Sequence, residues 1–285
     1  MINEAQFKKE IDLIINNALR EDVGEGDHSS LACIPSDASG KAHLLIKEDC
    51  VIAGLEFAEL VFKKVCQKYT ISFLVNEGDV VKNGDIAFIV EANSQEILKA
   101  ERLVLNAMQR MSAIATKTRK FVDELHGTST QILDTRKTTP GFRALEKWAV
   151  KIGGGVNHRF ALYDMIMLKD NHIDFAGGIP EAIQKTKAYL KNNHLDLKII
   201  VEARDLDEVK AILDAGGVYR ILLDNFNYKQ TEEAVQLINH QCLTESSGGI
   251  TLETAKAYAQ CGVDFISSGA LTHSVYNKDM SLKAI

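Results

Sequence analysis

Residues 198–226, "KIIVEARDLDEVKAILDAGGVYRILLDNF", decide the fold class of this chain. An apolar run at 199–201 is followed by a segment with helical spacing at 205–216 and by a second apolar run at 221–223. Continuous apolar runs are typical of strands buried on both faces, and a helix between two such strands indicates a parallel strand–helix–strand unit. The stretch therefore predicts an α/β fold.

The same alternation extends on both sides of this stretch, from about residue 128 onward. Further apolar runs are "QILD" (131–134), "DMIMLKD" (164–170), "GITLE" (249–253) and "DFISSGA" (264–270), and further helical patterns occupy 178–193, 228–240 and 251–262. Six or seven such units in about 150 residues favour a barrel over a flat sheet. We therefore predict a barrel of parallel strands and helices from about residue 128 onward.

The first third of the chain has a different pattern, which mixes helices, short strands and turns. Its helices are expected at 1–20, 55–67 and 94–125, and its strands within 41–54 and 69–81, with hairpin-type turns at "NEGD" (76–79) and "KNGD" (82–85). In the first helix, one side is expected to carry Ile11, Leu13, Ile14, Ile15 and Leu19. The stretch 75–92 is similar to a biotinyl or lipoyl carrier, but Lys82 lies in a generic turn, so carrier chemistry is not expected.

The overall composition excludes several classes of protein. The formal net charge of −6 argues against nucleic-acid binding, which needs broad positive potential. No apolar run approaches the roughly 20 residues that span a bilayer, and residues 1–20 lack the continuous apolar core of a signal peptide. The five cysteines form no CxxC pair, which favours reduced thiols in a cytoplasmic protein over a zinc ribbon.

Polar residues follow the apolar runs, and this repetition indicates one shared site. They include Asp134 and Lys169 after the first two runs, Glu202 and Asp224 after the next two, Glu245 after "QCLT" (241–244), and Ser268 after the last. Polar residues after a strand are ordinary in any one loop. In an α/β barrel, however, all carboxyl-terminal strand ends open on one face, where active sites are built.

The charge around these strand ends predicts an anionic substrate. Residues 136–172 contain seven Lys or Arg (136, 137, 143, 147, 151, 159, 169) and three acidic residues (146, 164, 170), in a chain whose total charge is −6. Arginine suits carboxylates and phosphates because its planar fork binds two oxygens. Within this set we expect Lys147 and Lys151 to be solvated helix residues, whereas the role of Arg143 stays open.

Three further patterns add to this picture. Glu202 and Asp224 end consecutive runs, where carboxylates could be ion-pair partners, ligands of Mg²⁺ or partners of ribose hydroxyls. The turns "ESSGGI" (245–250) and "SSGA" (267–270) can present backbone N–H groups to a phosphate. The glycines at 153–155 lead to His158, which either contacts a ligand or is a hydrogen-bonded structural residue.

The block "DTRKTTPGFRALEKWAVKIGGGVNHRFALYDMIMLKDNHI" (134–173) closely resembles the quinolinate phosphoribosyltransferase family. "REDVGEGDHSS", "VEA", "LLDNF", "ESSGGI" and "ISSGALTHS" extend the resemblance over about residues 20–276. Serines in "GDHSS" and "ESSGGI" stand where relatives often have Thr and Ala.

The resemblance implies a pentosyltransferase of NAD biosynthesis. Such an enzyme converts quinolinate and phosphoribosyl pyrophosphate, with Mg²⁺ and no organic cofactor, into nicotinate mononucleotide, pyrophosphate and CO₂. It also implies a two-domain α/β fold, with an N-terminal α/β sandwich domain at 1–117, an open α/β barrel of about seven strands at 118–275, and a tail at 276–285 that packs on the first domain. The expected assembly is a cytoplasmic homodimer with a shared active site, or hexamers of such dimers. Nucleic-acid and membrane partners are not expected.

The resemblance also assigns roles to residues, position by position. The catalytic residues would be Lys137, Lys169, Glu202 and Asp224. Substrate contacts would come from these four and from Arg110, Thr135, Arg136, His158, Arg159, Ser247, Gly248, Gly249, Ser268, Gly269 and Ala270. Arg110 would be supplied by the neighbouring subunit, although the sequence by itself predicts a solvated helix residue there. Glu202 and Asp224 would hold Mg²⁺, directly or through water.

Two alternatives stay open from the sequence. One is a related phosphoribosyltransferase that acts on nicotinate or another anionic base, including a relative linked to molybdenum metabolism. The dense set of cations favours a dicarboxylate over a substrate with one carboxylate. The other is a phosphate-metabolite binding protein without activity, but all the expected catalytic residue types are present.

Overall fold

The computed structural model describes residues 3–285, which form two compact units. The N-terminal unit comprises residues 3–119, 138–154 and 271–285, and the barrel unit comprises 120–137 and 155–270. The division differs from the sequence-based one because 138–154 and 271–275 group with the N-terminal unit. The tail at 276–285 also belongs to this unit, where β12 pairs with β1, in agreement with the expected packing of the tail. None of the helices within 3–285 has the length and apolar character needed to cross a bilayer.

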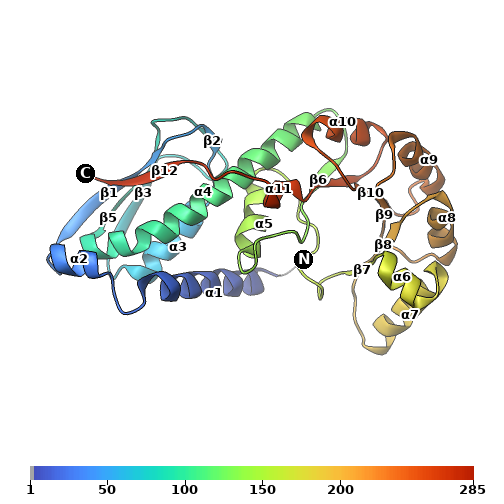
Figure 1. The fold of residues 1–285 in the computed structure, drawn as a ribbon, viewed down its shortest axis with the longest axis horizontal. Coiled ribbons are helices and arrows are strands. Elements are labelled where there is room, and N and C mark those ends of the chain that lie inside the picture. Colours follow the sequence, from blue (N-terminus) through green and yellow to red (C-terminus); the bar gives the residue numbers. More distant parts are fainter. Residues whose placement is uncertain (1–2) are drawn as a thin grey trace. The chain divides into compact units, whose positions relative to one another are not determined.

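The N-terminal unit contains both sheets and helices, as predicted. Its elements, labelled in Figure 1, are α1 (Glu4–Val23), α2 (His28–Cys33), β1 (Ser39–Ile46), β2 (Cys50–Val51), α3 (Leu55–Val65), β3 (Tyr69–Phe73), β4 (Val80–Val81), β5 (Ile86–Asn93), α4 (Ser94–Glu124), α5 (Arg143–Ile152), α11 (Ala270–His273) and β12 (Met280–Ala284). The last residues of α4, from 120, and the first of α11, Ala270, belong to the barrel unit.

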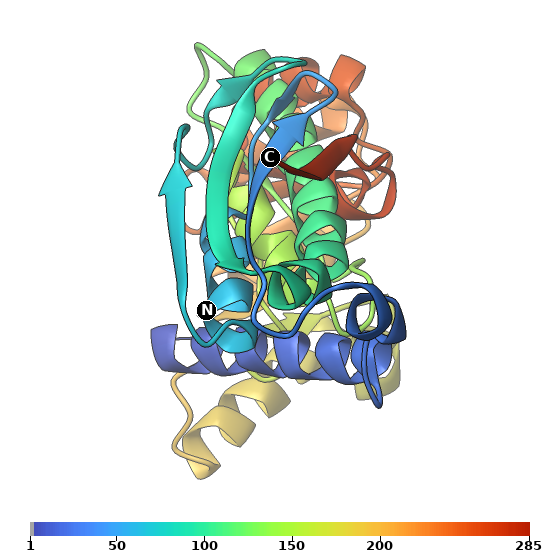
Figure 2. The same cartoon turned by 90° about the vertical axis from the view of Figure 1, so that its left-hand side faces the viewer.

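An antiparallel sheet in the order β12-β1-β5-β3 forms one layer of the N-terminal unit. Figure 2 shows its strands in front, with α3 and α4 behind them. Alternate residues of β1, namely Ala42, Leu44 and Ile46, are buried, as expected when one face of a sheet is covered. Phe62 of α3 packs edge-to-face on Phe88 of β5, with ring centroids 6.0 Å apart.

Two details of the N-terminal unit correct the sequence-based expectations. Ile11 and Ile15 of α1 are buried, but Leu13 is 45% exposed, because two residues along a helix turn the side chain to the opposite side. The turns at 76–79 and 82–85 form, but they join no hairpin. β4 pairs with β2, whereas β3 and β5 belong to the larger sheet, so neither turn connects strands that pair with each other.

The barrel unit is built on a parallel sheet with the order β6-β11-β10-β9-β8-β7. Its elements are β6 (Gln131–Leu133), β7 (Ile166–Leu168), α6 (Asp170–Ala176), α7 (Ile179–Asn192), β8 (Ile199–Ala203), α8 (Leu206–Ala215), β9 (Arg220–Asp224), α9 (Tyr228–Ile238), β10 (Leu243–Ser247), α10 (Leu252–Gln260) and β11 (Phe265–Ser267). Successive helices α6 to α10 pack against one another along one side of the strands. The predicted α/β fold is confirmed.

The sheet of the barrel unit is open, with six strands rather than about seven. Its first and last strands in order, β6 and β7, do not pair with each other. Beside β6, the chain makes a single parallel bridge between Val156 and Leu133. This one bridge does not extend into a further strand. "GITLE" is not a strand: Gly249 has a φ of 60°, and α10 begins at Leu252. The strand is β10, which carries the polar sequence "LTESS".

Candidate active site

Strand register in the barrel unit brings the carboxyl ends of the strands to one edge. Asp224 of β9 lies opposite Ser247 of β10, and β10, β11 and β6 continue in parallel register beside them. Glu202 of β8 and Glu245 of β10 both lie opposite Leu222 of β9. This row of residues is two positions before the row of Asp224 and Ser247. Because side chains alternate along a strand, Glu202, Asp224 and Glu245 point to the same face.

Lys169, Glu202 and Asp224 form the centre of this edge. Lys169 Nζ lies 2.8 Å from Glu202 Oε2, and the Glu202 side chain is only 7% exposed whereas that of Lys169 is 47% exposed. Burial raises the pKa of the Asp224 carboxyl, and the negative charge of Glu202 raises it further. Two carboxylates that repel each other beside one lysine make a site that favours an additional positive charge.

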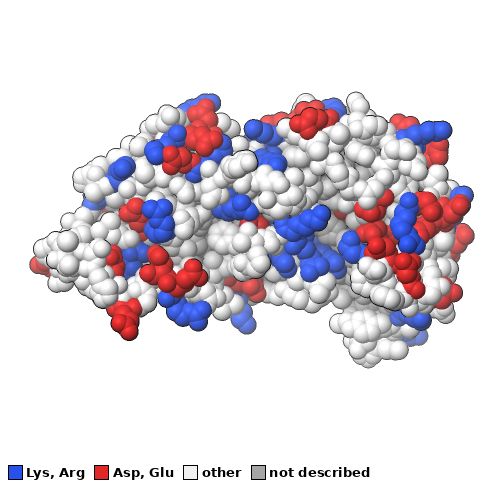
Figure 3. Space-filling model, viewed as in Figure 1, with Lys and Arg blue, Asp and Glu red and all other residues white. Residues whose placement is uncertain are grey.

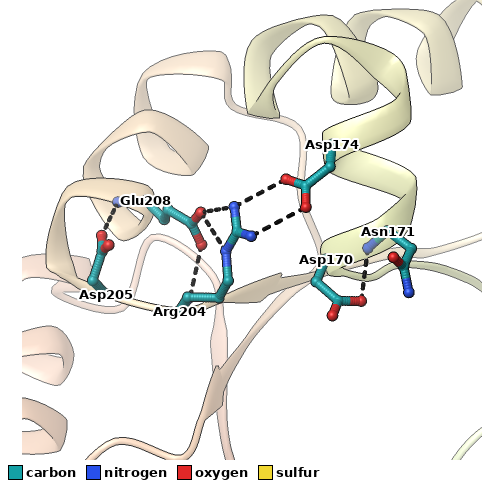
Figure 4. A network of polar contacts seen from close by, with 6 residues as sticks. All are labelled: Asp170, Asn171, Asp174, Arg204, Asp205 and Glu208. Carbon is teal, nitrogen blue, oxygen red and sulfur yellow. Dashed lines mark hydrogen bonds and ion pairs between the residues drawn. The ribbon is translucent and has the colours of Figure 1, made fainter.

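Helix α6 holds Lys169 at its first turn, and a network of charged side chains fastens that helix. The backbone N–H of Lys169 donates to His172 Nδ1 at 3.1 Å. Figure 4 shows the Arg204 guanidinium between two carboxylates, Asp174 of α6 and Glu208 of α8, at 3.2 and 2.6 Å. Arg204 follows β8, two residues after Glu202. The network therefore ties the helix that begins after Lys169 to the strand that carries its partner.

Arg136 and Arg159 provide the cationic part of the edge. The Arg159 side chain is buried and donates from Nη1 to the carbonyl oxygen of Met165 at 3.1 Å. Burial lowers the pKa of the Arg159 guanidinium, and the positive charge of Arg136 lowers it further. The positive charges of the two guanidinium groups repel each other. An anion that binds between them would relieve this repulsion.

Thr135 and Lys137 belong to the same loop as Arg136. The backbone N–H of Lys137 donates to Thr135 Oγ1 at 3.0 Å, which shapes the turn, and Lys137 itself is exposed. In the middle of Figure 3, below the place that β6 occupies in Figure 1, Lys and Arg side chains gather with few acidic neighbours.

His158 lies beneath the edge rather than on it. Its ring is buried, with Nε2 3.3 Å from Glu245 Oε2, and Nδ1 accepts the backbone N–H of Arg159 at 2.6 Å. Asp134 at the end of β6 accepts from the His158 backbone N–H at 2.8 Å and from Asn157 Nδ2 at 2.7 Å. Of the two readings left open by the sequence, these contacts match a hydrogen-bonded histidine.

Glu245 and Arg220 form a buried ion pair that the sequence did not predict. Arg220 Nη1 lies 2.7 Å from Glu245 Oε2, and the Arg220 guanidinium also stacks over the Phe265 ring at 4.1 Å. Burial by itself would raise the pKa of the Glu245 carboxyl, but hydrogen bonds and charges from His158 and Arg220 outweigh it and lower the pKa to about 2. Glu245 is therefore an anion in the interior of the barrel unit.

The lowered pKa of Glu245 predicts how stability depends on pH. A carboxyl with a lower pKa in the folded than in the unfolded state stabilises the fold above its unfolded pKa of about 4.5, and this contribution disappears as pH falls through about 2. We expect the unfolding free energy of wild type to fall between pH 5 and about 2.5 more steeply than that of Glu245→Gln. Urea denaturation across this range measures it; parallel curves for the two proteins would refute the expectation.

The two predicted phosphate loops adopt compact turns. Gly248 has a φ of 94° and Gly249 a φ of 60°, and a Cβ on Gly248 would lie 2.1 Å from Asn225 Oδ1. Asn225 N donates to the carbonyl of Ser247 at 2.8 Å, and its Nδ2 donates to Asp224 Oδ2 at 2.8 Å. In the second loop, Ser268 Oγ donates to the carbonyl of Ile250 at 3.0 Å, which joins the two turns. Gly269 and Ala270 follow it, half-buried.

Arg110 lies in the N-terminal unit and is not a solvated helix residue. Its guanidinium donates to Glu146 Oε1 from Nε at 3.1 Å and from Nη2 at 2.9 Å, and to the carbonyl of Thr272 at 2.5 Å. Glu146 is fully buried and also accepts from Thr139 N and Oγ1, at 3.2 and 2.8 Å. Helix α4, helix α5 and the loop after Lys137 are therefore joined through one carboxylate.

The remaining cations of the 136–172 segment divide into three cases. Lys151 is exposed as expected. Lys147 is 3% exposed, so the expectation of a solvated residue was wrong; in α5 it lies among buried neighbours on both sides in the sequence. Arg143 donates from Nε to Thr138 Oγ1 at 3.0 Å and so supports the loop that leaves Lys137.

Within residues 3–285 no group of three or more His, Cys, Asp or Glu side chains is arranged to hold a metal ion alone. Glu202 and Asp224 are nevertheless suitable for Mg²⁺, because this ion is commonly bound by one or two carboxylates together with substrate phosphates and water. The raised pKa of Asp224 beside Glu202 is the observation that fits a cation there.

Comparison with known proteins agrees with this geometry. The model of the quinolinate phosphoribosyl transferase C-terminal domain matches residues 114–283, and that of the N-terminal domain matches residues 27–112. The chain belongs to the quinolinate phosphoribosyltransferase family. The resemblance to this family, stated from the sequence, is thereby confirmed for both domains.

Two relatives of this phosphoribosyltransferase align with nearly the whole length of the chain. Quinolinate phosphoribosyltransferase [decarboxylating] 2b, mitochondrial, of Nicotiana tabacum is 46% identical, covering 95% of this chain and 81% of the relative. Nicotinate-nucleotide pyrophosphorylase [carboxylating] of Mycobacterium leprae is 40% identical and covers 99% of both chains. The structure of nicotinate-nucleotide pyrophosphorylase from Francisella tularensis has a TM-score of 0.89 at 34% identity, covering 97% of this chain and 96% of that one.

Proposed function

We propose that this protein transfers the phosphoribosyl group of phosphoribosyl pyrophosphate to quinolinate and decarboxylates the product to nicotinate mononucleotide, a step of NAD biosynthesis. The arrangement at the barrel edge carries the proposal: two neighbouring guanidinium groups, Arg136 and Arg159, lie in the same unit as the Lys169–Glu202–Asp224 cluster. Cations can bind the quinolinate carboxylates and the pyrophosphate, while carboxylates can face the ribose.

In the transfer step, the ring nitrogen of quinolinate forms a bond to the anomeric carbon. The bond from that carbon to pyrophosphate breaks, and its electron pair leaves with the pyrophosphate. Positive charge develops on the sugar, where the fixed carboxylates Glu202 and Asp224 stabilise it. Lys169 keeps the Glu202 carboxylate in place, at 2.8 Å. The turns at Ser247–Gly249 and Ser268–Ala270 present N–H groups to the 5′-phosphate.

In the decarboxylation step, the bond between C2 of the ring and its carboxylate breaks and releases CO₂. The electron pair stays on C2, where the positively charged ring nitrogen stabilises it, so no organic cofactor is needed. A proton then adds to C2, and either Lys137 or Lys169 is the donor. Arg136, His158 and Arg159 orient the substrate, the first and last by direct charge–charge contact.

We also propose that Glu202 and Asp224 hold Mg²⁺, directly or through water, when phosphoribosyl pyrophosphate is bound. The ion supplies positive charge that neutralises the leaving pyrophosphate. Two adjacent carboxylates, one with a raised pKa, support this proposal. Turnover should vanish after chelation by EDTA and return on adding Mg²⁺; full activity in EDTA would refute the proposal.

The decisive assay compares two bases under identical conditions. With phosphoribosyl pyrophosphate, Mg²⁺ and quinolinate labelled in the C2 carboxylate, we expect stoichiometric labelled CO₂ and nicotinate mononucleotide. Nicotinate should give at least about a hundredfold lower kcat/KM, because one carboxylate leaves part of the cationic pocket unpaired. Faster turnover of nicotinate would favour the alternative phosphoribosyltransferase, and tight binding without product would favour a binding protein.

Arg110 motivates a proposal about assembly. We propose a homodimer, itself the building block of any hexamer, in which Arg110 of one subunit serves the active site of the other. Two inactive variants, Arg110→Ala and Lys169→Ala, should then regain partial activity when unfolded and refolded together, because mixed dimers contain one intact site. Absence of any recovery, with mixed dimers verified by mass, would contradict a shared site.

The proposed location is the cytoplasm. The tobacco relative's name places that protein in mitochondria, whereas the name of the Mycobacterium leprae relative gives no compartment. Cell fractionation followed by the labelled-CO₂ assay tests the location.

A further inference from the structure

Glu245 is a buried anion that the reaction described above does not use. It lies in β10 two residues before Ser247, so its side chain points to the same face as the edge residues, one layer deeper. Its exposed fraction is 0%, and its partners Arg220 and His158 come from β9 and from the loop before β7. The carboxylate is therefore placed directly under the candidate site.

The contacts of His158 determine which of its nitrogens carries the proton. The backbone N–H of Arg159 donates to Nδ1, so Nδ1 has no proton in the neutral ring. The proton then lies on Nε2, which faces Glu245 Oε2 at 3.3 Å. The Glu245 anion attracts the Nε2–H group, which favours that tautomer and this orientation of the ring, although Nε2 and Oε2 are not aligned as a hydrogen bond.

The same contacts fix the backbone that carries Arg159. Asp134 holds the His158 N–H from one side, and the His158 ring holds the Arg159 N–H from the other. Arg159 is buried next to Arg136 and uses Nη1 to bind the Met165 carbonyl. A change in the orientation of the His158 ring would therefore move the backbone nitrogen of Arg159, and with it the guanidinium that we place at the substrate anion.

We propose that Glu245 is a positioning residue, which acts through the His158 ring and the Arg159 backbone to hold the Arg159 guanidinium where the substrate anion binds. The proposal rests on the proposed function only in assigning Arg159 to the substrate. Glu245 does not itself touch substrate. Its other partner, Arg220 of β9, lies 2.7 Å from the same carboxylate and neutralises the buried charge.

The first test is a comparison of two variants. Glu245→Gln keeps the volume of the side chain but removes the charge, and we expect about a ten- to hundredfold higher KM for quinolinate with a smaller change in kcat. Arg220→Met is the matched control: it breaks the other ion pair of Glu245, so we expect a lower melting temperature but a KM within about threefold of wild type. A folded Glu245→Gln protein with wild-type KM would overturn the proposal.

The second test asks whether Glu245 acts through His158. In a double-mutant cycle, adding Glu245→Gln to His158→Asn should change KM little further, because the route to Arg159 is already broken. Full multiplication of the two effects would instead show that Glu245 acts only on general stability. Additivity within error would therefore count against the proposal.

The third test needs no activity. In protein labelled with ¹⁵N-histidine, the wild-type His158 shifts should show a protonated Nε2 and an unprotonated Nδ1, and Glu245→Gln should move them toward a tautomer mixture. If quinolinate is not the substrate, this result still stands while the turnover assays fail, so the two failures are distinguishable. Unchanged His158 shifts in Glu245→Gln would refute the positioning role.

Discussion

Replacing Lys169 by methionine should lower kcat/KM for quinolinate by about 10²–10³-fold, the cost of losing one fixed charge in an active site. The substitution keeps the apolar stem and removes the ammonium group that lies 2.8 Å from Glu202. Glu202 and Asp224 would then repel each other without the positive charge of Lys169 beside them. The pKa of the Asp224 carboxyl, which burial and the Glu202 charge already raise, would rise further. A protonated carboxyl cannot stabilise positive charge on the sugar.

Lys210→Met is the matched control for this experiment. Lys210 also forms an ion pair, at 2.8 Å to Asp207, but it is 57% exposed on α8 and belongs to no part of the candidate site. Its replacement should leave turnover unchanged, because exposed ion pairs contribute little. Steady-state kinetics with both substrates, together with melting temperatures, separate a chemical effect from unfolding. Normal turnover in both Lys169→Met and Lys137→Met would disprove the assignment of the cationic pocket.

Lys169, Glu202 and Asp224 could be chosen from the sequence because each follows an apolar run directly. Parallel strands deliver their carboxyl ends to one edge, so position along the chain is enough to predict that such residues meet. The same argument needs no knowledge of side-chain contacts. It does not, however, predict that Lys169 and Glu202 form an ion pair, since that depends on which adjacent strands are in register.

The ion pair between Glu245 and Arg220 could not be predicted in this way. Arg220 begins its strand and looks like a residue before an apolar run, and Glu245 lies inside the polar sequence "LTESS". The sequence does predict a strand end at "QCLT" (241–244), directly before Glu245, but β10 continues through the polar residues to Ser247. The signal that could have helped is the opposite charge of the two residues: Glu245 lies opposite Leu222 of β9, and Arg220 lies two residues before Leu222. Only register makes that visible.

Errors in the N-terminal unit have the same origin. Turn sequences such as "NEGD" predict where the chain reverses, but not which strands pair afterwards, and here the neighbours in sequence join different sheets. Lys147 is buried because α5 belongs to the N-terminal unit, where Phe7 of α1 packs on the neighbouring Trp148 at 5.4 Å. Helical spacing identifies an apolar side of a helix, but it does not indicate that a charged residue is enclosed.

Replacing Gly248 by alanine should have the second large effect, about a hundredfold loss of kcat/KM, as expected when site residues are displaced by about 1 Å. The added Cβ would lie 2.1 Å from Asn225 Oδ1 and 3.0 Å from the Asn225 backbone nitrogen, so the Asn225 residue must move. Asn225 donates to Asp224 at 2.8 Å, and the displacement would reach the catalytic carboxylate as well as the phosphate turn. We therefore expect both a higher KM for phosphoribosyl pyrophosphate and a lower kcat.

Gly127→Ala separates this steric effect from backbone strain. Gly127 has a φ of 84°, close to the 94° of Gly248, but nothing lies within 4 Å of an added Cβ. Both variants should lose about 1–2 kcal/mol of unfolding free energy from the left-handed backbone, measurable by urea denaturation. Only Gly248→Ala should lose turnover, because only there does the methyl group displace a neighbour of Asp224. If Gly127→Ala were impaired equally, strain alone would explain the loss, and the coupling between Gly248, Asn225 and Asp224 would be wrong.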